Sequence, residues 1–294
     1  MRDTILFGDC RQTLKEFDEK ARMCVTSPPY YGLRDYGGED SQIGQEQTPE
    51  EYIEQLVNVF KEVKNVLTDD GTCWVNLGDS YYNYRPGRGQ GLAKQTVSNT
   101  KQDLPDVCPR RGNRIRGLKE KDLIGIPWMF AFAMRADGWY LRQDIIWSKP
   151  NPMPESVRDR CTKSHEYIFL FSKNQNYYFN VDAIKEPTVD GKGLKRKKSV
   201  WDIRTKAYKE AHFAVYPPEL IEPCIKSGSE EGDIVLDPFM GSGTTAAVAK
   251  SLGRDYIGCE LHEDYGNLIQ KRVGQYHPVE EVSQEPSINI LDIV

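Results

Sequence analysis

The chain has 294 residues, of which 38% are hydrophobic, and a formal net charge of -5. This length suits one large domain or two small ones with a substantial core. It contains no run of 18 apolar residues, and MRDTILFGDC at its start lacks the basic, apolar and small-residue parts of a secretory signal. These features argue against a membrane protein and predict a cytoplasmic one.

The seven cysteines and four histidines are scattered, without a CxxC pair or an HExxH motif. Neither a disulfide framework nor a zinc site is supported by that spacing. We therefore expect free cysteines and no metal.

The first half of the chain predicts alternating strands and helices. Short apolar runs at 4–9 and 22–27 indicate strands separated by a short helix. The segment TPEEYIEQLVNVFKEVKNVL has a Thr N-cap, a proline at the first helical position and apolar residues at helical spacing, which predicts a helix. A strand over 71–79 precedes a stretch over 81–121 that is rich in glycine and arginine.

The second half continues the alternation. A buried helix over 122–138 is followed by strands at 139–149 and 165–173 on either side of a proline-rich loop. A basic stretch covers 173–211, and the region 216–273 reads as helix, strand, helix, strand, helix. This order predicts an α/β fold with a mostly parallel, doubly wound sheet, in which ligands bind at the carboxyl ends of the strands.

Positive charge is concentrated in two segments. Ten lysines or arginines stand against three acidic residues between Arg85 and Lys121, and eight against one between Lys192 and Lys209. Each segment carries about +7, which leaves about -19 for the rest of the chain. Tyrosine and tryptophan residues are interleaved with both segments, so we interpret them as a nucleic-acid footprint on an acidic body.

A glycine turn lies between two of the predicted strands. Gly241 and Gly243 follow one strand, and Glu260 ends the next. Glycines let a backbone approach a ligand closely, and an acid in this place can accept ribose hydroxyls. The turn is neither GxGxxG nor a P-loop, and Asp237 just before it would repel phosphate. A nucleoside cofactor with a cationic part therefore fits best.

Two motifs carry a family resemblance. DPFMGSGTT (237–245) followed by Glu260 resembles the S-adenosylmethionine motif of amino-group DNA methyltransferases, and TSPPY (26–30) resembles their catalytic motif, which is Asp, Asn or Ser followed by two prolines and an aromatic residue. Their order resembles the beta-type permutation, and the likeness runs from Thr4 to about Val273.

The resemblance implies one catalytic domain over 1–294, S-adenosyl-L-methionine as cofactor and double-stranded DNA as substrate. It also implies a prokaryotic or phage origin, a cognate restriction endonuclease as a further partner, and action as a monomer or homodimer. The segment 212–221 resembles the lead-in that closes over the methionine end. By the same likeness, Asp9 lies over the adenine, and the cofactor contacts are Asp9, Asp237, Pro238, Phe239, Gly241, Gly243, Thr244, Thr245 and Glu260.

The residue types of TSPPY suit methylation of an exocyclic amine. The lone pair of this amine is delocalised into the ring of the base. Two acceptors for the N–H hydrogens favour a nitrogen whose lone pair is localised. Ser27 Oγ and the Pro28 carbonyl are the expected acceptors, while Pro28 and Pro29 stiffen the segment. The target base must be flipped out of the duplex, and Tyr30 is the expected stacking platform.

DNA contacts are expected from both basic segments, as insertions at 81–121 and 173–211. The family's recognition segment is expected in the second of these, and the first is an additional insertion, so either one could read sequence. The candidates are Arg85, Arg88, Arg110, Arg111, Arg114, Arg116, Lys195, Arg196, Lys197 and Lys198.

Several alternatives remain open from sequence alone. In the family that the chain resembles, serine at the first motif position usually goes with cytosine N4 and Asp or Asn with adenine N6, so Ser27 favours cytosine over adenine. Pro223-Cys224 is the type of pair that serves C5-cytosine methylation, although it falls in a predicted helix. A nucleic-acid-binding protein without catalysis is the fourth reading. Asp79 ends a predicted strand at the same edge of the sheet as Ser27, where it could belong to the site. The alternative is that it caps a helix or lies in a loop.

Overall fold

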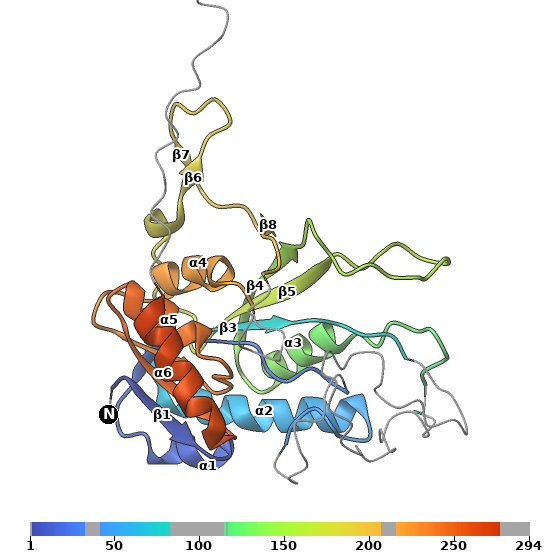
Figure 1. The fold of residues 1–294 in the computed structure, drawn as a ribbon, viewed down its shortest axis with the longest axis horizontal. Helices are drawn as coiled ribbons and strands as arrows, with labels where there is room; N and C mark the ends of the chain where they lie inside the picture. Colours follow the sequence, from blue (N-terminus) through green and yellow to red (C-terminus); the bar gives the residue numbers. More distant parts are fainter. Residues whose placement is uncertain (1, 33–41, 83–114, 116, 207–215, 277–294) are drawn as a thin grey trace, which may run out of the picture.

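An eight-stranded sheet forms the centre of the protein (Figure 1). The computed structural model describes residues 2–32, 42–82, 115, 117–206 and 216–276. The strand order is β1-β10-β9-β2-β3-β5-β4-β8. The strands are β1 (Thr4–Phe7), β2 (Ala21–Thr26), β3 (Leu67–Leu77), β4 (Tyr140–Ser148), β5 (His165–Ser172), β8 (Val200–Asp202), β9 (Ile234–Asp237) and β10 (Asp255–Glu260).

The predicted parallel arrangement is confirmed for most of the sheet. All neighbours from β1 to β3 are parallel, whereas β5 is antiparallel to both β3 and β4. β5 runs in the opposite direction to β4 because a loop, without a crossover helix, joins the two strands. As a result, the end of β4 and the start of β5 lie at the same edge of the sheet as the ends of β2, β9 and β10.

Helices cover both faces, as a doubly wound fold requires. One buried cluster contains Tyr52, Phe60 and Phe130 and joins helices before β4 to the sheet; the other contains Ile225 and Ile269 and joins helices from the last third of the chain. In Figure 1, α2 and α3 lie below β3 and α4 lies above it. The α-helices are α1 (Cys10–Thr13), α2 (Pro49–Val66), α3 (Ile126–Ala136), α4 (Pro218–Gly228), α5 (Thr244–Ser251) and α6 (Gly266–Gln275), and the 3-10 turns are η1 (Leu14–Glu16), η2 (Asp182–Ile184) and η3 (Glu263–Tyr265).

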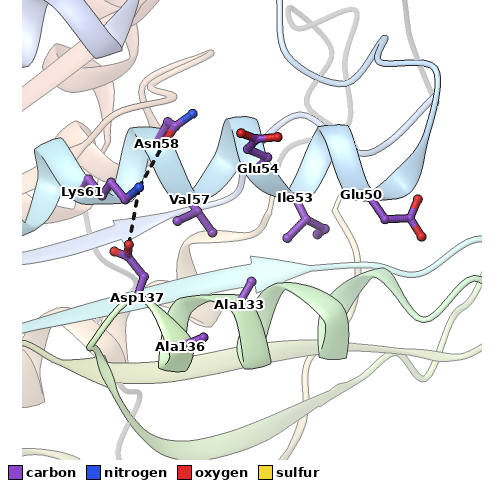
Figure 2. Close-up of a pocket in the computed structure, with 9 residues that line it drawn as sticks. All are labelled: Glu50, Ile53, Glu54, Val57, Asn58, Lys61, Ala133, Ala136 and Asp137. Atoms are coloured by element: carbon purple, nitrogen blue, oxygen red, sulfur yellow. Dashed lines mark hydrogen bonds and ion pairs between the residues drawn. The ribbon is translucent and has the colours of Figure 1, made fainter.

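Helix α2 starts as the sequence predicts. Thr48 Oγ1 accepts from the Glu51 backbone N–H, and the Glu51 carboxylate accepts from the Thr48 N–H, which completes a capping box. Between α2 and α3 lies an open groove of about 430 Å³ (Figure 2). Its middle is apolar, and Lys61 pairs with Asp137 across it. Neither predicted motif contributes to this groove.

The second basic segment has more structure than its composition suggested. β6 (Glu186–Pro187) and β7 (Leu194–Lys195) form a small hairpin of their own, which projects at the top of Figure 1. After it, β8 pairs with β4, and the Trp147 indole N–H donates to the Ile203 carbonyl at 2.8 Å. Burial of Trp201 at 5% exposure fixes β8 on the sheet.

Within the described part of the chain, none of the helices combines the length and apolar character that crossing a lipid bilayer requires.

Candidate active site

The two predicted motifs meet at neighbouring strand ends. β2 and β9 pair in parallel, with Cys24 opposite Leu236. Thr26, the residue before Ser27, donates its hydroxyl to Asp237 Oδ1 at 2.5 Å. Residues separated by 211 positions in the sequence are thereby joined at the edge where the fold places ligands.

Asp237 is the hub of this contact and is only 1% exposed. Besides Thr26, its carboxylate accepts from the Phe239 N–H at 3.0 Å, from the Tyr216 hydroxyl at 3.2 Å and from the Thr245 hydroxyl. Burial raises the pKa of Asp237, and the hydrogen bonds from Thr245 and Thr26 oppose that rise. Both carboxylate oxygens are thus used inside the protein, so this group holds the turn in place.

The two glycines of the turn have different surroundings. Both have positive φ, +53° at Gly241 and +82° at Gly243. A Cβ on Gly243 would lie 2.9 Å from Ile269 Cγ2, so its absence is needed for α5 to pack on α6. A Cβ on Gly241 would meet only the Phe239 carbonyl, at 3.9 Å. Gly241 therefore presents bare backbone in a space that a ligand can enter.

Glu260 lies across this space at the end of β10. Its Oε2 accepts from the Gly241 N–H at 2.8 Å and its Oε1 from the His262 N–H at 3.1 Å. Burial raises the pKa of Glu260. Each carboxylate oxygen has a second lone pair, so ribose hydroxyls can still be accepted. Phe7, which pairs with Glu260 in the β1–β10 ladder, is 39% exposed, and its ring lies close to Gly266 at the start of α6.

These features fit S-adenosyl-L-methionine. The open backbone of Gly241 suits close approach, the Glu260 carboxylate suits a ribose, and neither requires phosphate binding. The other predicted contacts frame the same turn: Pro238 is buried, Phe239 is half-buried, and Thr244 and Thr245 are buried in the first turn of α5.

Asp9 lies at the end of β1 and forms an ion pair with Arg11 at 2.6 Å. It also accepts from the Arg11 backbone N–H at 2.9 Å, which caps α1. Burial would raise the pKa of Asp9, but the hydrogen bonds from Arg11 outweigh it and the pKa is lowered. Asp9 is thus held as a carboxylate, and its predicted place over an adenine stays a prediction.

The serine and the two prolines after β2 are supported from α2. Ser27 and Pro29 are half-buried and Pro28 is buried. The Pro29 carbonyl accepts from the hydroxyl of Tyr52, a fully buried residue of α2, at 2.8 Å. The two prolines restrict the backbone of this segment, and the bond to Tyr52 anchors it on α2.

Tyr30 is fixed by a polar network that the sequence analysis missed. Its hydroxyl donates to Glu166 Oε2 at 2.7 Å, and Asn76 Nδ2 donates to the same oxygen at 3.2 Å. Lys149 pairs with Glu166 Oε1. A Cβ on Gly78 would lie 2.7 Å from Tyr30 Cε2, so the ring rests on bare backbone. Burial is the main cause that raises the pKa of the Tyr30 hydroxyl, and the nearby Glu166 carboxylate raises it further. A hydrogen bond with Ser27 opposes this rise.

Asp79 serves as a helix cap, one of the two roles considered from sequence. Its Oδ1 accepts from the N–H groups of Gly125 and Ile126 at 3.0 and 3.1 Å, where α3 begins. The carboxylate thus meets the positive end of α3.

The predicted DNA-contacting residues fall into two groups. The six arginines of the first segment (Arg85, Arg88, Arg110, Arg111, Arg114 and Arg116) lie outside the described residues. In the second segment, Lys195 pairs with Glu186 at 3.6 Å, and the Lys197 ammonium lies 5.2 Å from the centre of the Trp201 ring. Arg196 and Lys198 are exposed. Cationic groups of this segment therefore face solvent.

Cys224 does not have the environment of a nucleophile. It is fully buried on α4, its thiol donates to the Leu220 carbonyl at 3.6 Å, and burial raises its pKa. A thiolate that attacks a ring carbon needs access and a lowered pKa. The C5-cytosine alternative is therefore inconsistent with the structure.

Solved structures share this fold. The PvuII DNA methyltransferase, described as cytosine-N4-specific, matches with a TM-score of 0.66 and 20% sequence identity, over 96% of this chain and 89% of that one. M1.HpyAVI, solved as a complex with S-adenosylmethionine, matches with a TM-score of 0.53 and 19% identity, over 92% and 98%. The fold is that of the S-adenosylmethionine-dependent methyltransferases.

Sequence comparisons give the family. The DNA methylase model N6_N4_Mtase matches residues 21–271. The type II methyltransferase M.XycI of Xanthomonas campestris pv. cyanopsidis is 47% identical over 93% of this chain and 88% of its own length, and M.SmaI of Serratia marcescens is 48% identical over 92% and 90%. The chain therefore belongs to the family of DNA amino-methyltransferases that transfer a methyl group from S-adenosyl-L-methionine to cytosine N4 or adenine N6.

The two turn glycines should respond differently to alanine. Gly241→Ala keeps the fold, at a backbone cost of about 1 to 2 kcal/mol, because only the positive φ is violated. It should lower the affinity for S-adenosyl-L-methionine by about tenfold or more, since the methyl group occupies the open space. Gly243→Ala adds the clash with Ile269 and should destabilise the protein more. Urea unfolding and calorimetric titration measure both; unchanged cofactor affinity in Gly241→Ala would refute the assignment.

The bond between Tyr30 and Glu166 can be tested with a double-mutant cycle. Tyr30→Phe and Glu166→Ala each remove it, so single-turnover methylation should slow in both, by up to the ~1.5 to 3 kcal/mol of a hydrogen bond to a charged group. The double variant should be no slower than the worse single one. Tyr31→Phe, which loses a hydroxyl bonded to the Gln47 carbonyl, is the control and should be near wild type. Additive losses would show that the two residues act separately.

Proposed function

We propose that the protein methylates the exocyclic N4 of cytosine at a specific site in double-stranded DNA. The observation that carries this proposal is the contact between Thr26 and Asp237, which places the Ser27–Tyr30 ledge next to the cofactor turn. Methyl transfer needs the nucleophile and the donor in line at contact distance, and the two adjacent strand ends supply that proximity.

Ser27 and Pro28 act on the target amine. When bound, S-adenosyl-L-methionine supplies an electrophilic methyl group on a sulfonium. The Ser27 hydroxyl and the Pro28 carbonyl accept the two N–H hydrogens, which leaves the nitrogen lone pair free to attack. Transfer of the methyl group to the amine would leave the cofactor as a neutral thioether, and the N–H proton that the nitrogen gives up would leave to solvent. No covalent enzyme intermediate is involved, in agreement with the burial of Cys224.

Tyr30 replaces the stacking that the base loses when it leaves the duplex. Base-on-aromatic stacking contributes roughly 1 to 3 kcal/mol. The Glu166 bond and the Gly78 contact fix the ring before DNA arrives, so little ordering remains for the bound state. Asp9, the turn 237–245 and Glu260 serve the cofactor in this proposal, with Asp237 as a positioning residue.

Cytosine is favoured over adenine by the serine of the ledge. In the chain's family, Ser at the place of Ser27 usually goes with cytosine N4, and a protein of the same fold, the PvuII enzyme, is described as cytosine-N4-specific. Methylation of adenine N6 is the second candidate, because the family includes both activities.

The remaining partners are inferred from the charge of the two basic segments and from the similarity to type II methyltransferases. We propose that the chain is one catalytic domain whose two basic segments contact DNA phosphates, with the exposed Arg196 and Lys198 among the contacts. Since the relatives are type II methyltransferases, a cognate endonuclease that reads the same site is proposed as well. The enzyme acts as a monomer or homodimer in this proposal.

The modified base decides the proposal. DNA from cells that express the protein is digested to nucleosides and analysed by mass spectrometry, with N4-methylcytosine expected. Ser27→Ala should abolish it, because the hydroxyl acceptor is lost. Cys224→Ala is the control for the C5 mechanism and should still methylate. N6-methyladenine would overturn the choice of base, and loss of activity in Cys224→Ala would overturn the amine mechanism.

A further inference from the structure

The loop between β4 and β5, residues 149–164, carries an unusually bare apolar side chain. Met153 is 82% exposed and lies between Pro152 and Pro154. An exposed methionine gains nothing for folding, and the flanking prolines restrict the backbone that presents it. In Figure 1 this loop projects from the ends of β4 and β5, away from the helices.

The root of the loop lies at the same edge of the sheet as the catalytic ledge. Ser148 pairs with His165 at the sheet edge where β2 ends, and β5 and β4 are two and three positions from β2. At the usual strand spacing, the root is about 10 to 15 Å from the end of β2. Lys149, the first loop residue, pairs with Glu166, which also holds the Tyr30 hydroxyl.

The loop is braced on both sides of Met153. Glu155 accepts from Arg160 Nη1 at 2.7 Å, from Arg160 Nη2 at 3.1 Å and from the Lys163 N–H at 3.1 Å. Asn151 exchanges two hydrogen bonds with the Thr205 backbone, at 3.0 and 3.1 Å. Such bracing holds the backbone around Met153 while its side chain stays exposed.

We propose that Met153 inserts into the DNA stack at the target position and fills the space that the flipped base leaves. Apolar side chains such as methionine and proline act as wedges between base steps in this way. Braced loops resist the compression of insertion, and a thioether adapts to the shape of a base gap. The inference rests on the base flipping of the proposed function.

Another exposed apolar residue competes for this role. Val189, on the β6–β7 hairpin, is 98% exposed. That hairpin belongs to a separate two-stranded sheet, and among the described residues no contact joins it to Tyr30 as Lys149 and Glu166 join the 149–164 loop. Valine also reaches less far than methionine. Val189, on the β6–β7 hairpin, therefore serves as a control outside the 149–164 loop.

Mismatch rescue tests the wedge. The substrate is a duplex with the site found by sequencing methylated DNA, either fully paired or mismatched at the target base, where less energy is needed for flipping. Met153→Ala should methylate the paired duplex on the order of tenfold more slowly and the mismatched duplex nearly as fast as wild type. Val157→Ala in the same loop and Val189→Ala should match wild type on both.

The outcomes separate the wedge from the underlying activity. Unchanged rates for Met153→Ala on the paired duplex, or equal losses on both duplexes, would overturn the proposal, as would a paired-only defect in Val189→Ala. Cofactor affinity and melting temperature of Met153→Ala should equal those of wild type. Absence of methylated base with wild type would instead sink the proposed function itself, on which the wedge rests.

Discussion

The active site depends on one buried carboxylate. Asp237 takes donors from β2, from the turn, from α5 and from Tyr216, so four segments of the chain converge on one group. Burying a carboxylate is unfavourable unless its hydrogen bonds are satisfied, and the raised pKa of Asp237 shows that burial is not fully offset. The fold accepts this cost, and the result is a fixed separation between the ledge and the cofactor turn. Misplacement by about 1 Å can reduce a rate by about a hundredfold.

Glu166 plays a comparable part on the substrate side. It joins Tyr30, which follows β2, to Asn76 on β3 and to Lys149 at the end of β4. The antiparallel β5 makes this possible, because its first residues, rather than its last, lie at the functional edge. Because β5 is reversed, the Glu166 carboxylate at its start reaches Tyr30, the ring on which the base is proposed to stack.

Sequence was a good guide to what depends on local pattern. The cap and proline of α2, the glycine turn and the alternation of strands with helices are set by residues close together in the chain, and the structure confirms them. It was a poor guide to contacts between distant segments. Glu166 looked like one polar residue at the start of an apolar strand, and Asn76 looked like a polar interruption in CWVNLGD. Their roles appear only when β3 and β5 are paired, since Asn76 then lies opposite Ile168 and reaches the Glu166 carboxylate.

The position of Asp237 shows why a motif alone leaves a role open. From sequence, an acid before a glycine turn is a candidate to meet the cationic part of a cofactor, and Glu260 is a candidate for its ribose. Both are carboxylates on adjacent parallel strands, yet Asp237 is 1% exposed with hydrogen-bonded oxygens, whereas Glu260 is only half-buried and accepts two backbone N–H groups. The difference comes from Thr26, Tyr216 and Thr245, which surround one acid and not the other. Burial by tertiary neighbours, rather than the motif, therefore distinguishes the two acids: Asp237 is used up in internal hydrogen bonds, whereas Glu260 keeps lone pairs that are free to accept from a ligand.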